Sequence, residues 1–173
     1  MRTDILRYIA RFVLLVILQI FILNNIQLGG YINPYAYILF LIVLPVNTNK
    51  VASLFIAFFM GIVIDTFSNS MGLHTSACLV LAFVRPAALR LLSPRDGYEA
   101  DAIPSINSFG IRWFLLLTLI LTLAHHFTLF YLEVFRLSEF FTTFVRVMAS
   151  SVSTVATVLL IQYLFAGQPD NRL

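Results

Sequence analysis

The sequence predicts an all-α integral membrane protein with six transmembrane helices. Hydrophobic residues make up 60% of the 173 residues, charged residues make up only 11%, and 17 residues are Phe. A typical soluble domain is about 45–50% apolar and about 25% charged, and a globule with the present composition would expose large apolar patches to water. No polar stretch is long enough to form a soluble domain, so residues 1–173 are expected to form a single membrane domain.

The first expected span covers residues 8–28. It follows a basic start, which is also how a secretory signal peptide begins. However, the apolar stretch continues to about Leu28, and no small-residue cleavage site follows it. We therefore expect a retained transmembrane helix.

Two shorter spans follow, over residues 34–46 and 51–67. Gly29 and Gly30 favour a turn before the first of them, and Pro34 suits the first turn of a helix, where its missing N–H does no harm. A bilayer core about 30 Å thick needs about 20 helical residues. Both segments are shorter, so flanking residues must extend them or the bilayer must thin locally.

The fourth expected span, residues 73–92, contains Arg85 followed by Pro86. One alternative is a helix that continues through Pro86 with a kink and extends Arg85 outward to the membrane surface. The other is a separate interfacial helix over residues 86–92. The sequence alone leaves both alternatives open.

The last two spans are expected over residues 111–132 and 140–165. The chain before them, residues 93–108, is the only sustained polar stretch, and we expect it to be a loop. A short charged turn, residues 133–139, separates the two spans.

The basic residues predict the orientation of the six spans. Cytoplasmic loops of membrane proteins carry an excess of Lys and Arg. If the N-terminus is cytoplasmic, nine of the 11 basic residues lie inside: Arg2, Arg7, Arg11, Lys50, Arg85, Arg90, Arg95, Arg112 and Arg172. Arg136 then lies outside, and Arg146 lies within the last span. We therefore expect both termini in the cytoplasm.

Five ionisable residues fall toward the outer side of the spans: Asp65, His74, His125, His126 and Arg146. Ionisable residues inside a membrane are costly and usually functional. They could form one intramembrane polar cluster, with Asp65 and Arg146 as its charge pair. The alternative is that Arg146 reaches the outer headgroups and Asp65 only ends a helix.

Catalytic, metal and cofactor sites are not indicated. The side chains of His125 and His126 point about 100° apart on a helix, so they do not form the i, i+4 pair of a zinc site. The sequence contains no His-Glu-x-x-His, no Gly-x-Ser-x-Gly and no phosphate-binding glycine loop. Its single cysteine, Cys78, excludes a disulfide framework. The net charge of +3 reports topology and not nucleic-acid binding.

Small residues recur at helical spacing in two spans. Ala57 and Gly61 lie four residues apart, and Ala149, Ser153 and either Ala156 or Thr157 form a similar stripe. Small residues let helices approach closely in lipid. They serve either internal packing or the docking of a partner's transmembrane helix.

One segment resembles a known family. Residues 61–75 follow the pattern Gly-x-x-x-Asp-x-x-Ser and then Gly-Leu-His. This pattern resembles the signature of MreD, the rod-shape-determining membrane protein of bacteria, and the order of spans is similar. The matching residues are Gly61, Asp65, Ser68, Gly72 and His74.

The resemblance implies a non-enzymatic component of the cell-elongation machinery in the bacterial cytoplasmic membrane. MreD-like proteins associate with the bitopic protein MreC, and through it with MreB, RodA and a penicillin-binding transpeptidase. Their fold is held to be similar to the six-helix substrate-binding subunits of energy-coupling-factor transporters. On this basis Gly61 would permit close helix approach, Gly72 would allow a tight turn, and Asp65 would accept hydrogen bonds from that turn or cap the next helix.

A second hypothesis is that the chain is the substrate-binding subunit of a small-molecule, vitamin-type transporter. Such a subunit needs a cavity of about 300–1,000 Å³ with convergent polar groups. A scaffold can instead have a collapsed core. The sequence does not decide the oligomeric state and leaves a homodimer open.

Overall fold

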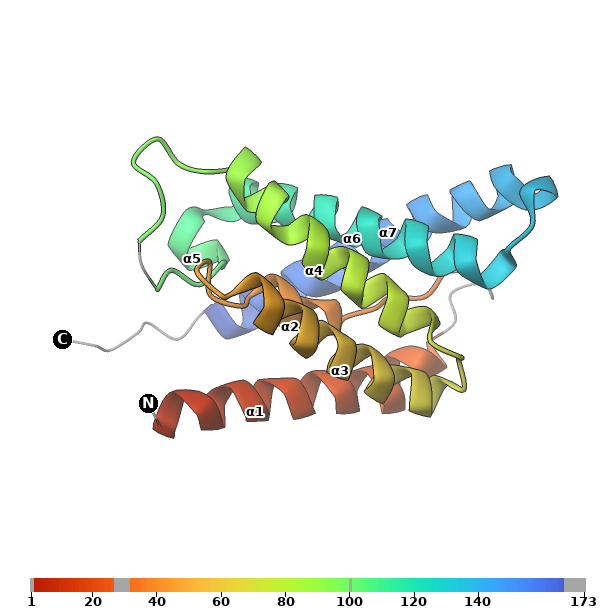
Figure 1. Ribbon diagram of the computed structural model, residues 1–173, viewed down its shortest axis with the longest axis horizontal. Coiled ribbons are helices and arrows are strands. Elements are labelled where there is room, and N and C mark those ends of the chain that lie inside the picture. Colours follow the sequence, from red (N-terminus) through yellow and green to blue (C-terminus); the bar gives the residue numbers. More distant parts are fainter. Residues whose placement is uncertain (1, 27–31, 100, 167–173) are drawn as a thin grey trace.

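The fold is that of a computed structural model, which describes residues 2–26, 32–99 and 101–166 (Figure 1). Every regular element within these ranges is a helix. Four helical stretches are long and apolar enough to cross a membrane: Leu6–Asn25, Lys50–Ser68, Ile111–Val134 and Phe140–Phe165. These stretches confirm a multi-pass helical membrane protein. The turn expected at Gly29 and Gly30 lies outside the described residues.

The first span consists of three helical types in succession. The α-helix α1 (Arg2–Ile17) continues into the π-helical turn η1 (Leu18–Ile22) and the 3₁₀ turn η2 (Leu23–Asn25). The π turn contains Gln19, which is fully buried. Such turns occur frequently at functional sites.

The second predicted span contains only one short helix, α2 (Ile38–Ile42). The prediction of a helix over residues 34–46 is therefore wrong for most of that range, where the chain is turn or extended. We call residues 33–46 the broken segment.

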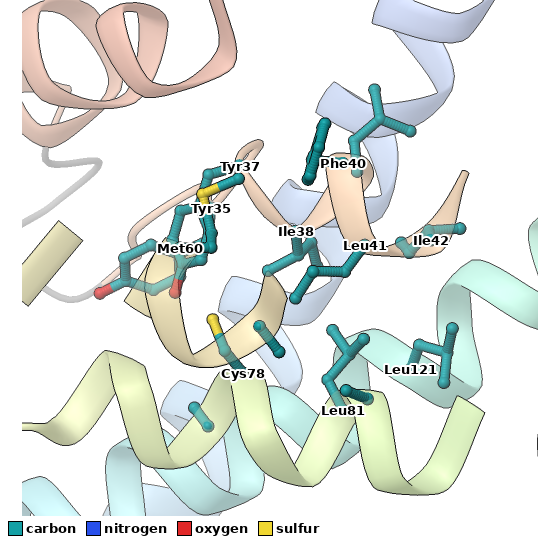
Figure 2. Close-up of a cluster of buried hydrophobic side chains, with 14 of the residues drawn as sticks. Tyr35, Tyr37, Ile38, Phe40, Leu41, Ile42, Met60, Cys78, Leu81 and Leu121 are labelled. Carbon is teal, nitrogen blue, oxygen red and sulfur yellow. The ribbon is translucent and has the colours of Figure 1, made fainter. Parts of the chain in front are cut away.

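The broken segment lies at the centre of the molecule. Residues 34–44 are all buried. Figure 2 shows Met60 of α3 and Cys78 and Leu81 of α4 packed around it, and all three are fully buried. Non-helical backbone is tolerated at membrane depth only where protein or a water-filled cavity covers it. The central position of this segment therefore permits its irregular conformation.

The helices expected over residues 51–67 and 73–92 are present with similar bounds, as α3 (Lys50–Ser68) and α4 (Leu73–Leu91). Of these two, α3 is among the four stretches that could cross a membrane and α4 is not. Asn49 caps α3, because its Oδ1 accepts a hydrogen bond from the Val51 N–H at 2.8 Å. The helix α4 continues through Pro86, so the structure takes the first of the two alternatives for this span.

Arg85 does not extend outward, and that part of the expectation is wrong. Only 2% of the residue is exposed. Its Nη2 donates to the main-chain carbonyls of Ile42, Leu44 and Pro45 in the broken segment. The last carbonyls of a helix lack intrahelical donors, and a cation at a helix C-terminus is favourable. Arg85 therefore donates to the last carbonyl of α2 and to two carbonyls of the non-helical chain that follows it.

The remaining helices are α5 (Ile106–Phe109), α6 (Ile111–Val134), η3 (Leu137–Glu139) and α7 (Phe140–Ala166). The polar loop before them covers the end of α4. Tyr98 Oη donates to the Leu89 carbonyl at 2.7 Å, and Trp113 Nε1 donates to the Leu92 carbonyl at 2.7 Å. Burial in this loop raises the pKa of the Tyr98 hydroxyl above its usual value.

The long helices pack in chain order, α3 on α4, α4 on α6 and α6 on α7. Figure 1 shows that α1 begins and α7 ends at the same end of the molecule. Residues 92–99 and 101–105 lie at that end, which we call the loop end. The α3–α4 and α6–α7 connections lie at the opposite end, which we call the turn end.

Candidate functional site

The motif corner, residues 61–75, is organised around the Asp65 carboxylate. Asp65 is 8% exposed and accepts four hydrogen bonds. Oδ1 accepts from Ser70 Oγ at 2.6 Å and from the His74 N–H at 3.0 Å. Oδ2 accepts from the Thr75 N–H at 2.9 Å and from Thr75 Oγ1 at 2.6 Å. The expected role of Asp65 is thus confirmed: it holds the turn and caps α4 from the preceding helix.

The two motif glycines each meet a steric requirement. A Cβ on Gly61 would lie 2.3 Å from Thr75 Cα, so α3 and α4 can touch at this point only through a glycine. Gly72, at the N-cap of α4, has φ +81°, a left-handed conformation that favours glycine. Both expectations for these residues are confirmed, and with Ala57 also fully buried the small residues of α3 serve internal packing.

The two other motif residues face away from the carboxylate. Ser68 Oγ accepts from Asn24 Nδ2 at 3.3 Å, which links η2 to the end of α3. The His74 side chain points into the bundle, where Nδ1 lies 2.8 Å from Tyr37 Oη.

A hydrogen-bonded chain of buried side chains begins at His74. Tyr37 Oη also lies 2.7 Å from His125 Nε2, and His125 Nδ1 lies 3.3 Å from His126 Nδ1. The chain ends where His126 Nε2 lies 3.1 Å from Thr154 Oγ1. We call these five residues the histidine chain. It joins α4, the broken segment, α6 and α7.

The adjacent residues His125 and His126 occupy successive places in this chain, and their side chains point to different elements. His125 faces Tyr37 of the broken segment, whereas His126 faces Thr154 of α7. Both histidine side chains are completely buried. The predicted cluster is therefore present for His74, His125 and His126, and Asp65 joins it through the backbone of His74.

The predicted charge pair between Asp65 and Arg146 is wrong. Arg146 Nη1 lies 3.1 Å from Glu133 Oε2, and its guanidinium carbon lies 4.3 Å from the centre of the Phe130 ring. Glu133 ends α6 beside the start of α7, whereas the Asp65 oxygens already accept four hydrogen bonds. Arg146 therefore pairs with Glu133, and Asp65 is satisfied by the hydrogen bonds of its own turn.

Side chains from two helices also bind the start of the broken segment. Gln19 Nε2 donates to the Pro34 carbonyl at 3.1 Å. The Asn33 N–H donates to Ser150 Oγ at 3.3 Å, and the Tyr35 N–H donates to Thr154 Oγ1 at 3.0 Å. Buried polar side chains of the spans thus replace the helical hydrogen bonds that this segment lacks.

A cavity of about 770 Å³ lies at the turn end, between the motif corner and the Arg146–Glu133 pair. We call it the turn-end cavity. Its lining includes polar residues from η2, the broken segment, the motif corner, α6 and α7, namely Asn24, Asn33, Ser68, Asn69, Ser70, His74, Glu133 and Arg146. Its size lies within the range of small-molecule sites.

No metal centre is assembled from the described residues, since they contain no group of three or more His, Cys, Asp and Glu placed to hold a metal ion. Cys78 is a buried free thiol.

Sequence reasoning missed Tyr37, Thr154, Gln19 and Glu133 as members of the polar network. Their signal in the sequence is weak, because Tyr and Thr occur commonly in apolar segments.

Comparisons of the chain with protein-family models, with curated proteins and with solved structures found no match.

Proposed function

We propose that this chain is a non-enzymatic scaffold of the bacterial cell-elongation machinery and that it binds MreC in the cytoplasmic membrane. One observation carries the proposal: three of the five MreD-like residues each meet a specific requirement at one corner. Gly61 permits helix contact, Asp65 caps α4 and Gly72 takes a positive φ. A chance match of residue types would not be expected to meet three separate requirements.

The same corner offers a contact surface for a partner. The four hydrogen bonds to Asp65 hold the turn, while Met71 is fully exposed at its tip and Phe67 is 62% exposed beside it. Exposed apolar side chains on a rigid support suit a protein interface. In this proposal MreC binds the chain directly through its transmembrane helix, beside this turn, and MreB, RodA and the transpeptidase associate through MreC.

The proposed topology has six membrane crossings, with the broken segment as the second and α4 as the fourth. Broken segments of this kind are found inside helical membrane proteins where the surrounding helices cover them. Basic residues of the described chain lie near those helix ends that face the loop end: Arg7 early in α1, Lys50 at the start of α3, Arg90 at the end of α4, Arg95 in the loop and Arg112 at the start of α6. This distribution supports a cytoplasmic loop end.

The test of the scaffold function uses the variants Asp65→Asn and Asp65→Ala in cells that depend on this protein. Loss of the cap should destabilise the turn by about 1–3 kcal/mol. We expect rounded cells and reduced recovery of MreC in mild-detergent affinity purification. The control is Asp96→Asn, which alters an exposed carboxylate of the loop end. Normal rod shape together with normal MreC recovery in both Asp65 variants would overturn the proposal.

The turn-end cavity supports a second candidate function, the substrate-binding subunit of a small-molecule transporter. Its volume of about 770 Å³ and its polar lining meet the requirement stated for such a subunit. This candidate predicts tight binding of a vitamin-type compound by the purified protein. It also predicts that an ATPase pair and a coupling subunit co-purify in place of MreC.

A further inference from the structure

Arg146 lies at the junction of two hollows. One is the turn-end cavity. The other is an apolar groove of about 500 Å³, which we call the lateral groove. The lateral groove is lined by Ile32, Phe141, Thr142, Val145, Arg146 and Ala149. The two hollows share Arg146, so a polar site borders an apolar groove, an arrangement suited to an amphipathic molecule.

The lateral groove has the chemistry of an acyl-chain site. Phe141, Val145 and Ala149 are spaced four residues apart on α7, so they form one stripe along the helix. Phe141 is 82% exposed and Val145 is 66% exposed. In a helix that spans the bilayer, this stripe faces the lipid tails.

The polar part of the site carries one charge of each sign. The Arg146 guanidinium and the Glu133 carboxylate lie 3.1 Å apart, and their side chains are 21% and 41% exposed. The Nε atom of Arg146 is buried and has no hydrogen-bond partner among the described residues. The accessible parts of both side chains line the turn-end cavity, so a ligand with one negative and one positive group could bind both of them.

We propose that the site binds one zwitterionic phospholipid of the phosphoethanolamine class in the outer leaflet. The phosphate binds Arg146, the ammonium group binds Glu133, and one acyl chain lies in the lateral groove. A purely anionic headgroup would meet the Glu133 carboxylate with repulsion. A quaternary ammonium group cannot donate a hydrogen bond to that carboxylate.

The experiment is native mass spectrometry of the full chain, titrated with phosphatidylethanolamine, phosphatidylglycerol and phosphatidylcholine of identical acyl chains. We expect phosphatidylethanolamine to bind about tenfold more tightly than the other two lipids. Arg146→Gln should lower its binding about tenfold, and Glu133→Gln should abolish its advantage over phosphatidylglycerol. Ala149→Phe, which fills the lateral groove and leaves the charges unchanged, should weaken all three lipids.

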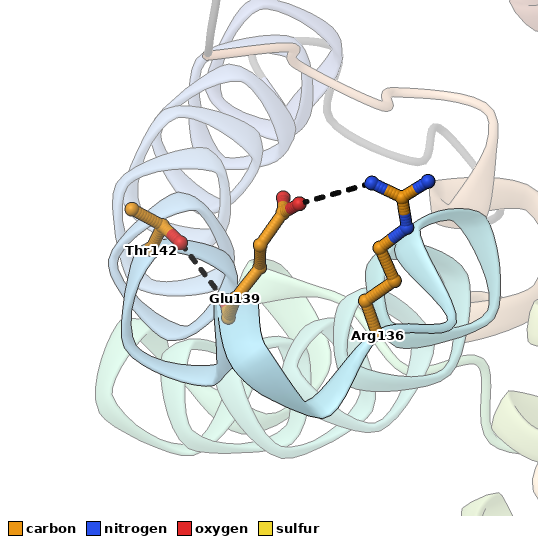
Figure 3. A network of polar contacts seen from close by, with 3 residues as sticks. All are labelled: Arg136, Glu139 and Thr142. Carbon is orange, nitrogen blue, oxygen red and sulfur yellow. Dashed lines mark hydrogen bonds and ion pairs between the residues drawn. The ribbon is translucent and has the colours of Figure 1, made fainter.

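The matched control is the ion pair of Arg136 and Glu139 in the α6–α7 turn (Figure 3). These side chains lie 3.7 Å apart and are 73% and 50% exposed, and neither lines either hollow. Arg136→Gln and Glu139→Gln should leave lipid binding unchanged.

Three outcomes would overturn the proposal. The first is equal binding of the three lipids by the wild-type chain, and the second is unchanged binding by folded Arg146→Gln and Glu133→Gln variants. The third is competition by soluble glycerophosphoethanolamine as strong as that of the lipid, which would show a solute site. If Arg146→Gln fails to fold, Glu133→Gln and Ala149→Phe decide the question. MreC plays no part in these measurements, so their outcome is independent of the scaffold function.

Discussion

At the scale of single residues, Tyr37 illustrates how buried polar groups depend on one another. Its hydroxyl oxygen lies 2.8 Å from His74 Nδ1 and 2.7 Å from His125 Nε2. A phenol has one proton, so Tyr37 donates to one imidazole and accepts from the other. Each of the two rings depends on this single oxygen atom for a hydrogen bond in the core.

Tyr37→Phe should therefore destabilise the protein by about 1–3 kcal/mol, because two buried imidazole nitrogens lose their partner. Thermal unfolding in detergent measures the effect. The matched control is Tyr163→Phe on α7, where the tyrosine is 75% exposed and the same atom is removed. Equal melting temperatures of the two variants would show that the histidine chain contributes no stability through Tyr37.

Gly61 lies in tight contact with the backbone of α4. A Cβ there would lie 2.3 Å from Thr75 Cα, which is a backbone atom and cannot rotate away. Gly61→Ala should push α3 and α4 apart and cost about 1–3 kcal/mol, although alanine favours a helix more than glycine does. Ala87→Val, which enlarges an exposed side chain of α4, serves as the control in the same unfolding measurement. A Gly61→Ala variant that is more stable than the wild type would show that this contact is not tight.

At the scale of the elements, the broken segment departs most from expectation. Residues 38–44 form an apolar run, and such a run is compatible with a buried helix or with other buried backbone. The choice is made by side chains far away in the sequence. Arg85 takes the carbonyls at one end of the segment, while Gln19 and Thr154 bind the backbone near the other.

Arg85→Gln should destabilise this segment by about 3 kcal/mol, because several buried carbonyls lose a charged donor. Unfolding in detergent should shift strongly, and proteolysis near residues 45–49 should accelerate. Arg90→Gln is the matched control, since Arg90 is exposed five residues further along the same helix. Unchanged proteolysis of Arg85→Gln would show that the carbonyls find other donors.

At the scale of the whole molecule, the orientation in the membrane is open to direct measurement. Met71 lies fully exposed at the turn end, and Asp96 lies exposed at the loop end. In intact cells whose outer membrane is permeabilised, Met71→Cys should react with a membrane-impermeant maleimide. Asp96→Cys should react only after the cytoplasmic membrane is opened.

The wild-type chain is the control for this labelling, because its single cysteine, Cys78, is fully buried. The reverse labelling pattern would invert the proposed topology. Labelling of both positions from outside would place Met71 and Asp96 on the same side of the membrane and would show that α4 does not cross it.

The sequence alone determined the class of the protein, the bounds of its long helices and the structure of the motif corner. These properties depend on composition and on residues close together in the chain. Apolar length selects membrane-spanning helices, and Gly61, Asp65 and Gly72 lie within a single helix–turn–helix unit. Their roles could therefore be inferred before the structure was known.

Only the tertiary structure decided which distant groups meet. It paired Arg146 with Glu133 instead of Asp65, buried Arg85 against the broken segment and brought Tyr37 between two histidines. These contacts join residues from 13 to 88 positions apart, and composition and helical spacing carry no information about such pairs. A buried polar group takes whichever partner the packing places within hydrogen-bond distance, because water is absent there.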